Sequence, residues 1–369
     1  MNTSAYHLSA RQVSTLMLAG LLAACGGGSD DSASTSSVRA ASIALEKPID
    51  NAAQPVRRHV RNGDVRGVTA LALARDRASV GVANADGRVV VVNTEGKEIK
   101  QLQGIGGSAA VGLVFSANGR FLVAVSRDSS ATAWNVETGE RRFSLSGQAH
   151  GLRTVSASAD GSLIATGGEE TRVMLWDGST GRLKQTLRGA TDFVNSVSVS
   201  ADARYVASGD ANATVLVWSV GTGKLLHTLR GHHAEVNAVT FSADGKWLAS
   251  ADQTGKVLLW DVASGRGQTA LAGHQAAVRT LAFDAESQML ASGAVDGKVV
   301  VWDVATRAEV PSVEGWRVGM ATALQSAPAG SAVNTLGFTS GTAGTVAQLM
   351  VGHEDSQVRS LSVTNASRR

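Results

Sequence analysis

The sequence predicts an all-β protein built from repeated four-stranded sheets, and three observations support this. Short runs rich in Val, Leu, Trp and Thr alternate with turn residues throughout the chain, a pattern typical of strands. Glycine is frequent, with 41 residues, whereas proline is scarce, with 4. Five of the seven tryptophans recur every 42 residues: Trp134, Trp176, Trp218, Trp260 and Trp302. Four strands in a period of this length indicate the blades of a β-propeller.

Residues 1–24 are expected to form a secretory signal peptide. Arg11 supplies a positive charge, and the apolar run 13–24 that follows is shorter than the about 20 residues needed to span a bilayer. The stretch Leu22-Ala23-Ala24-Cys25 resembles the lipobox of bacterial lipoproteins. The resemblance implies cleavage before Cys25 and attachment of lipid to this residue. The alternative is an ordinary signal peptide with an incidental cysteine.

Residues 25–55 are expected to be the lipidated cysteine and a flexible tether. The segment 26–37 contains no large apolar side chain and therefore cannot bury a core. Glycine, rather than aspartate, follows Cys25. By the sorting rule of bacterial lipoproteins, this implies a place in the cell envelope, on the outer membrane and facing the periplasm.

Residues 56–366 are expected to form the propeller, with repeats starting near 63, 105, 147, 189, 231, 273 and 315. The period 231–272 contains the strand candidates VNAVTFS, WLASAD, KVLLWDV and GQTALAG. Asp244-Gly245 separates the first two strands, and Asp-Gly accepts the positive φ angles of a tight hairpin. The apolar runs lack a 3.6-residue spacing, which argues against a helical repeat.

These repeats resemble the WD-repeat family over about 300 residues, from 56 to 362. In that family a Trp, a Ser or Thr, a His and an Asp form a hydrogen-bonded tetrad within each blade. The resemblance implies this structural role in period 273–314 for His274, Ser292, Asp296 and Trp302. In period 231–272 it implies the role for His232, Ser250 and Trp260, with Thr254 in the place of the Asp.

We expect seven four-stranded blades in a closed ring. The seventh period is irregular, and its fourth strand is expected to come from residues 56–62. The stretch VRRHVRNG (56–63) aligns with LLHTLRG (225–231), which is an outer strand candidate. This strand would complete the last blade and would remove open sheet edges.

Two sets of residues are candidates for binding a protein partner. The connection 314–332 is long for a compact repeat, and such loops are often functional. It carries Trp316, Arg317 and Met320, residue types enriched at interfaces. The second set flanks the first strands of the blades: Arg153, Phe193, Asn195, Glu235, Asn237 and Arg279. The alternatives are that Trp316 fills the tetrad pocket and that the second set is simply solvated.

No catalytic constellation, cofactor or metal site is predicted. Neither a phosphate-binding loop nor an H-E-x-x-H motif occurs. The net charge of +3 gives no basis for nucleic-acid binding, which needs a clustered basic face. A cation held by Asp210, Asp252 and His353 is conceivable from ligand chemistry, but a hydrated polar rim is favoured.

The sequence therefore predicts a monomeric, non-catalytic protein-interaction platform, anchored through lipid in the bacterial cell envelope. Two alternatives remain open, because a fold by itself does not fix function. One is an envelope enzyme, a hydrolase or lyase, with its active site in the propeller channel. The other is a binder of glycan or of a small ligand.

Overall fold

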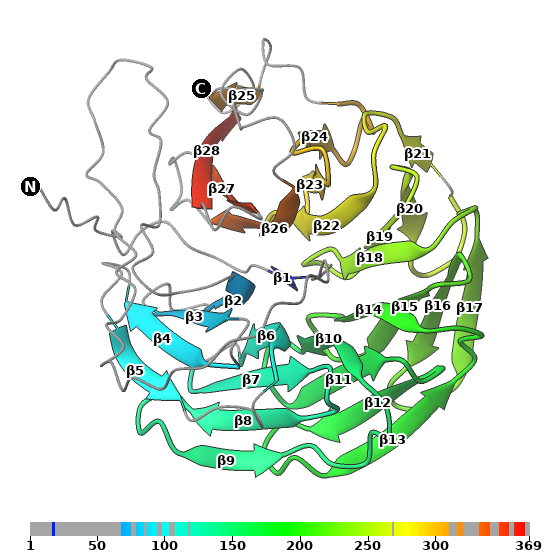
Figure 1. Cartoon of the computed structure of the whole chain (residues 1–369). Helices are drawn as coiled ribbons and strands as arrows, with labels where there is room; N and C mark the ends of the chain where they lie inside the picture. The colour runs from blue at the N-terminus through cyan, green and yellow to red at the C-terminus, as the bar shows by residue number, and fades with distance from the viewer. Residues whose placement is uncertain are drawn as a thin grey trace, which may run out of the picture.

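The computed structural model describes twelve parts of the chain: residues 17–18, 68–74, 79–84, 87–93, 98–102, 108–116, 119–267, 269–309, 316–319, 332–339, 347–353 and 358–365. Every regular element in these parts is a β-strand (Figure 1). Cys25, the tether and the segment 56–62 lie outside the described residues, as does Met320. The predictions made for Cys25, the tether and Met320 therefore stay predictions.

The described strands form seven antiparallel sheets, which we number in chain order. The first two sheets contain β2 (Val68–Leu73), β3 (Ser79–Asn84), β4 (Val89–Asn93) and β5 (Glu98–Leu102), then β6 (Ala110–Phe115), β7 (Phe121–Ser126), β8 (Ala131–Asn135) and β9 (Arg141–Ser144). The third and fourth contain β10 (Leu152–Ala157), β11 (Leu163–Gly168), β12 (Arg172–Asp177) and β13 (Leu183–Arg188), then β14 (Val194–Val199), β15 (Tyr205–Asp210), β16 (Thr214–Ser219) and β17 (Leu225–Arg230).

The fifth sheet contains β18 (Val236–Phe241), β19 (Trp247–Asp252), β20 (Val257–Asp261) and β21 (Thr269–Leu271). The sixth contains β22 (Val278–Phe283), β23 (Met289–Ala294) and β24 (Val299–Asp303). The seventh has the order β1 (Met17–Leu18), β26 (Val333–Thr339), β27 (Ala347–His353), β28 (Val358–Asn365) and β25 (Trp316–Gly319). The predicted repeat of four-stranded antiparallel sheets is confirmed in the first five.

The sheets are arranged around a centre, with the first strand of each one innermost (Figure 1). The strand β2 lies beside β6, and the contacts continue in chain order through β10, β14, β18 and β22 to β26. The two-residue strand β1 pairs with β26 and also neighbours β2, β6 and β22. It therefore lies among the innermost strands, although its residues belong to the predicted signal peptide.

The seventh sheet differs from the expectation drawn from the sequence. The segment that was expected to be part of a long connection contributes β25, whose Trp316 pairs with Asn365 of β28. This strand holds the outer position that residues 56–62 were predicted to fill. Trp and Val favour extended backbone, and a strand edge such as β28 offers unpaired N–H and C=O groups. The side chains of Trp316 and Arg317 are not described.

The first two strands of a sheet are joined by tight hairpins at the predicted places. Gly119, Gly161 and Gly245 adopt φ values of 67°, 70° and 71°. Ala203 and Ser287 hold the equivalent positions of the fourth and sixth sheets, each with φ of 58°. Because the turn has this conformation in each of these five sheets, non-glycine residues adopt it where glycine is lacking.

The core lies between neighbouring sheets rather than in one central mass. Six hydrophobic clusters each join two consecutive sheets, from the first and second to the sixth and seventh. The periodic tryptophans are among the largest fully buried side chains, each 1% exposed. Truncating a buried aromatic residue to alanine typically costs about 3–5 kcal/mol. The tryptophan spacing that defines the repeat therefore marks the residues that hold the sheets together.

A second set of contacts joins the third, fourth and fifth sheets along their innermost strands. Thr154 Oγ1 and Ser156 Oγ of β10 accept hydrogen bonds from the backbone N–H groups of Val197 and Val199, at 3.2 and 3.0 Å. One sheet further on, the hydroxyls of Ser196 and Ser198 accept from the N–H groups of Val239 and Phe241, at 3.1 and 3.2 Å. These side chains satisfy N–H groups on the free edge of the next innermost strand.

Candidate functional site

A β-bulge occurs at the start of the innermost strand in every one of the seven described sheets. In each case one residue is skipped in the register between the first and second strands. A bulge leaves the extra residue out of the ladder and re-aims its side chain. The bulged positions are Thr69, Val111, Arg153, Asn195, Asn237, Arg279 and Asn334. We call the end of the sheets that carries them the bulge face, and the opposite end the hairpin face.

On the bulge face, side chains of the third and fourth sheets form a direct contact cluster. The Arg153 guanidinium stacks over the Phe193 ring, 4.7 Å from its centroid. It donates a hydrogen bond to Asn195 Oδ1 at 2.9 Å and lies 3.7 Å from the Glu169 carboxylate. Phe193 remains 40% exposed. We call Arg153, Phe193, Asn195 and Glu169 the arginine cluster; it unites three of the residues predicted to bind a partner.

The surroundings of the arginine cluster are positively charged toward the second sheet. Burial and the neighbouring charge of Arg153 lower the pKa of Arg127, while Glu169 opposes this shift. Two donors, Arg153 Nε and Asn195 Nδ2, have no hydrogen-bond partner among the described residues. The cluster is therefore organised but not saturated with acceptors.

The other predicted partner-binding residues continue around the bulge face. Asn237 donates hydrogen bonds to Gln253 Oε1 at 2.9 Å and to the backbone oxygen of Val278 at 3.2 Å. Glu235 is exposed immediately before β18, and Arg279 is half-buried at the start of β22. These residues thus share one face with the arginine cluster, whereas Trp316 and Arg317 lie on the outermost strand of the seventh sheet.

The most complete tetrad lies in the fifth sheet, and its carboxylate is not at the position inferred from the sequence. The Trp260 indole donates to Ser250 Oγ at 2.8 Å, and Ser250 Oγ lies 2.6 Å from His232 Nε2. His232 Nδ1 contacts Asp252 Oδ2 at 2.8 Å. Thr254, which was predicted to stand in the place of the Asp, instead donates to Asp252 Oδ1 at 2.7 Å. Asp252, the last residue of β19, therefore completes the hydrogen-bonded tetrad.

The side chains of His232 and Asp252 are both fully buried. Burial alone would raise the pKa of Asp252, but hydrogen bonds from His232 and Thr254 outweigh it and lower the pKa to about 2. Both carboxylate oxygens of Asp252 are therefore engaged in hydrogen bonds within the fifth sheet. Its candidate role as a cation ligand is not supported by any group of three His, Cys, Asp or Glu within the described residues.

The sequence of the sixth sheet contains all four tetrad residue types, but their hydrogen bonds form a less complete tetrad. His274 Nε2 contacts Ser292 Oγ at 2.5 Å, but the Trp302 indole donates to the backbone oxygen of Ala272 at 3.2 Å. His274 Nδ1 has no hydrogen-bond partner among the described residues, and Asp296 accepts instead from the Lys298 N–H at 3.0 Å. Burial lowers the pKa of His274 to about 4, so this imidazole is neutral at physiological pH.

In the fourth sheet, alanine stands where the fifth has its buried histidine. Ala190 is the counterpart of His232, and Asp210 is the fully buried counterpart of Asp252. Burial raises the pKa of Asp210, although backbone N–H groups of Thr214, Thr191 and Asn212 oppose the shift. Ser208 Oγ has no hydrogen-bond partner among the described residues. The fourth sheet thus retains the serine and the aspartate of the tetrad but lacks the histidine that would join them.

Replacing Ala190 with histidine is expected to raise the free energy of unfolding by about 1 kcal/mol, the net value of a satisfied buried hydrogen bond. The new imidazole would join Ser208 to Asp210, as His232 joins Ser250 to Asp252. Urea unfolding measures the change. Ala190→Leu is the control, because it adds apolar bulk without ring nitrogens and should give no such gain. A histidine variant less stable than the parent chain would contradict the prediction.

Comparison with known families identifies four repeats in this region. The profile described as WD domain, G-beta repeat matches residues 139–177, 181–219, 223–261 and 265–303. Each match ends one residue after a buried periodic tryptophan. A search of curated proteins found no significant match. Among the described residues, no helix is long and apolar enough to cross a membrane.

Proposed function

Four WD40 repeats lie between residues 139 and 303, and from them we propose that this protein is a non-catalytic platform that binds a protein partner in the bacterial cell envelope. WD40 domains commonly mediate interactions between proteins. The observation that favours this role here is the arginine cluster. It presents a partly exposed aromatic ring and a stacked arginine at the start of the innermost strands β10 and β14.

The chemistry of the arginine cluster suits a protein interface. Arginine and aromatic residues dominate the binding energy of many interfaces, where they form a small buried centre within a larger contact area. Arg153 is held in place by Phe193, Asn195 and Glu169. Little side-chain freedom would be lost when a partner covers it, which favours affinity.

The proposal includes a closed ring of seven blades held at the membrane by lipid on Cys25. The unbroken succession of innermost strands from β2 to β26 supports the ring. The anchor rests on the lipobox resemblance of residues 22–25. The strand β1 precedes Cys25 and would be removed with the signal peptide. In the mature protein the innermost edge of β26 would then be free.

The partner site can be tested by crosslinking in cells. A photo-reactive amino acid at the exposed position Asp192, beside Phe193, is expected to capture a discrete protein. Arg153→Gln should abolish this capture in a chain of unchanged melting temperature. The matched control is Arg204→Gln, because Arg204 also stacks on an aromatic ring, 5.4 Å from the Tyr205 centroid, but at the hairpin face. Equal effects of the two variants, or no capture at all, would contradict the site.

The anchor is tested separately by metabolic labelling with palmitate. We expect incorporation into the parent chain and recovery in the outer-membrane fraction. Cys25→Ser should abolish the labelling. Labelling that persists without Cys25, or a parent chain that carries none, would contradict the anchor while leaving the partner site untouched.

A further inference from the structure

Exposed leucines and cations gather at the outer edge of the third and fourth sheets. Among the described residues five large apolar side chains are prominently exposed, and three of them begin β13 and β17: Leu183 at 47%, Leu225 at 43% and Leu226 at 43%. Arg182 and Lys184 flank the first of these, and Lys224 precedes the others; all three cations are exposed. We call these six residues the basic rim.

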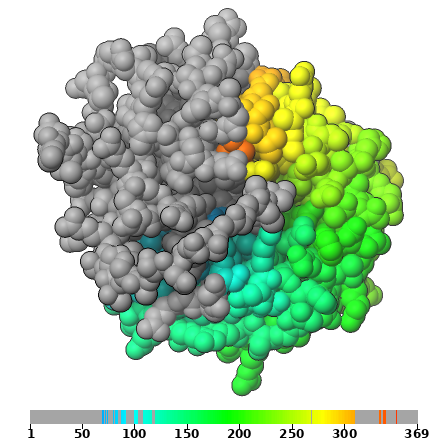
Figure 2. All heavy atoms as spheres, in the orientation of Figure 1, coloured from blue at the N-terminus to red at the C-terminus, as the bar shows by residue number. Residues whose placement is uncertain are grey.

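The position of the basic rim follows from the strand order. The innermost strands β10 and β14 begin at the bulge face, and each sheet then runs up and down through four antiparallel strands. The fourth strand must therefore begin at the hairpin face. Residues 180–230, drawn in green, reach the outer edge of the view in Figure 2. The basic rim thus lies at the opposite end of the sheets from the arginine cluster.

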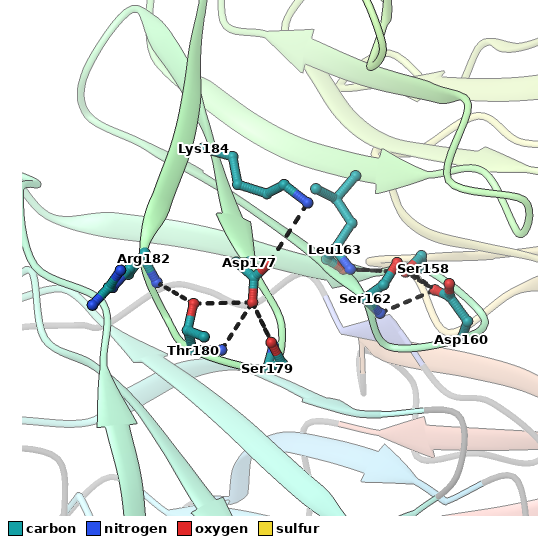
Figure 3. Close-up of polar contacts among 9 residues, drawn as sticks. All are labelled: Ser158, Asp160, Ser162, Leu163, Asp177, Ser179, Thr180, Arg182 and Lys184. Atoms are coloured by element: carbon teal, nitrogen blue, oxygen red, sulfur yellow. Dashed lines mark hydrogen bonds and ion pairs between the residues drawn. The ribbon is translucent and has the colours of Figure 1, made fainter.

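The cations of the basic rim are only partly compensated by nearby carboxylates. Lys184 Nζ lies 3.7 Å from Asp177, whereas the Arg182 side chain points away from that carboxylate (Figure 3). Hydrogen bonds from Ser179 and Thr180 hold the pKa of Asp177 well below its usual range. Asp177 therefore accepts hydrogen bonds within its own turn, and the Arg182 side chain is exposed to solvent.

The hairpins of the same face are balanced in charge, which sets the basic rim apart. In the fourth sheet Arg204 lies 4.0 Å from Asp202, and in the fifth sheet Lys246 lies 3.3 Å from Asp244. Neither hairpin carries an exposed large apolar residue. Ile99 of β5 is also exposed at the equivalent place, but the adjacent Lys100 is half-buried. The strands β13 and β17 therefore combine exposed leucines with exposed cations on two adjacent sheets.

We propose that the basic rim rests on an anionic phospholipid surface. Cations near such a surface are attracted by its negative potential, and leucines beside them can enter the interfacial region. Single exposed leucines need no explanation, but Leu183 and Leu225 hold equivalent places on adjacent sheets, and Leu226 beside them extends the contact zone. The proposal extends the membrane anchoring proposed above, yet it does not require lipid on Cys25. It would turn the bulge face away from the membrane.

Vesicle flotation tests the proposal with the full chain carrying Cys25→Ser. The vesicles contain phosphatidylethanolamine with either phosphatidylglycerol or phosphatidylcholine. We expect binding to the phosphatidylglycerol vesicles that weakens with salt. Reversing two charges, in Arg182→Glu/Lys224→Glu, should weaken it by tenfold or more. Leu225→Ser/Leu226→Ser should weaken binding several-fold at unchanged charge. Any contribution from residues 1–24 is common to all variants.

The matched control is Arg204→Glu/Lys246→Glu, which makes the same charge change at the balanced hairpins and should bind almost as the parent does. Equal losses in this control and in the rim variant would overturn the proposal, as would equal binding to both vesicle types. Dimerisation that Leu225→Ser/Leu226→Ser abolishes, without any effect on vesicle binding, would assign the leucines to a second copy of the chain instead. Because the Cys25→Ser chain carries no lipid, a failure of the vesicle experiment would not bear on the proposed lipid anchor, which the palmitate experiment tests separately.

Discussion

Replacing His232 with alanine is expected to lower the free energy of unfolding by about 3–5 kcal/mol, the usual cost of leaving a buried charge without its partner. The side chains of His232 and Asp252 are completely buried, 2.8 Å apart. The variant would leave the Asp252 carboxylate without its imidazole and Ser250 Oγ without the ring nitrogen at 2.6 Å. Denaturant unfolding, followed by tryptophan fluorescence, measures this loss.

The adjacent exposed residue supplies the control. His233→Ala removes the same side chain one position along and should change stability by no more than about 0.5 kcal/mol. Adding Asp252→Asn to His232→Ala should recover part of the loss, because the buried charge is removed. Equal stability of the His232→Ala and His233→Ala variants would show that the tetrad does not support the fifth sheet.

Replacing Asp284 with serine is expected to stabilise the protein at pH 7.5 and to abolish one component of its pH dependence. In four other sheets a serine hydroxyl at this position accepts the N–H of the residue five places on: Ser116, Ser158, Ser200 and Ser242. In the sixth sheet Asp284 accepts instead from Met289 and Gln288, at 2.9 and 2.7 Å. Asp284 is 3% exposed, and burial raises its pKa to about 6, with a smaller contribution from Glu286.

The sign of the pH effect follows from proton linkage. The folded state holds the Asp284 proton more tightly than the unfolded state, whose pKa is near 3.8. Stability from this residue is therefore greatest below about pH 4 and is lost as the pH rises through 6. The shift corresponds to a few kcal/mol, at about 1.4 kcal/mol for each pKa unit. Above pH 6 the folded protein carries this cost in full.

Urea unfolding at pH 5.0 and 7.5 checks the prediction. The difference in stability between the Asp284→Ser variant and the parent should be on the order of 2 kcal/mol at pH 7.5 and smaller at pH 5.0. Ser242→Asp is the reciprocal variant, since it places the same carboxyl group at the matched position of the fifth sheet. It should create the dependence that Asp284→Ser removes. Parallel pH profiles for parent and Asp284→Ser would refute the assignment.

The repeated sheets could be predicted from the sequence because each period contains the same buried core residues. Each buried tryptophan must fill the same space between two sheets, so it recurs every 42 residues, and the strand candidates of period 231–272 lie close to β18, β19, β20 and β21. The identity of the tetrad carboxylate could not be predicted in the same way. Asp252 and Thr254 are two residues apart, and only the backbone path after β19 decides which one meets His232.

Three of the four residues of the arginine cluster were predicted from the sequence, but Glu169 and the contacts among the four were not. Position relative to the first strand brought Arg153, Phe193 and Asn195 together as candidates. Their contact depends on the bulge, a backbone irregularity that leaves no residue-type signal in these strands. The Ser and Thr contacts between sheets, in contrast, correspond to a recognisable pattern in the sequence. Thr154 and Ser156 recur 42 residues later as Ser196 and Ser198, a hydroxyl pattern that core-based reasoning passes over.

Those hydroxyl contacts give the propeller an uneven stiffness. They couple the third sheet to the fourth and the fourth to the fifth. Toward the second sheet, Gly112 and Val114 stand at the corresponding positions and have no hydroxyl to offer. Toward the sixth, Ala238 replaces Ser196, whereas Thr240 keeps a hydroxyl at the place of Ser198. A force applied at the arginine cluster would therefore move three sheets as one lever. Strain would concentrate between the second and third sheets, where neither corresponding position carries a hydroxyl.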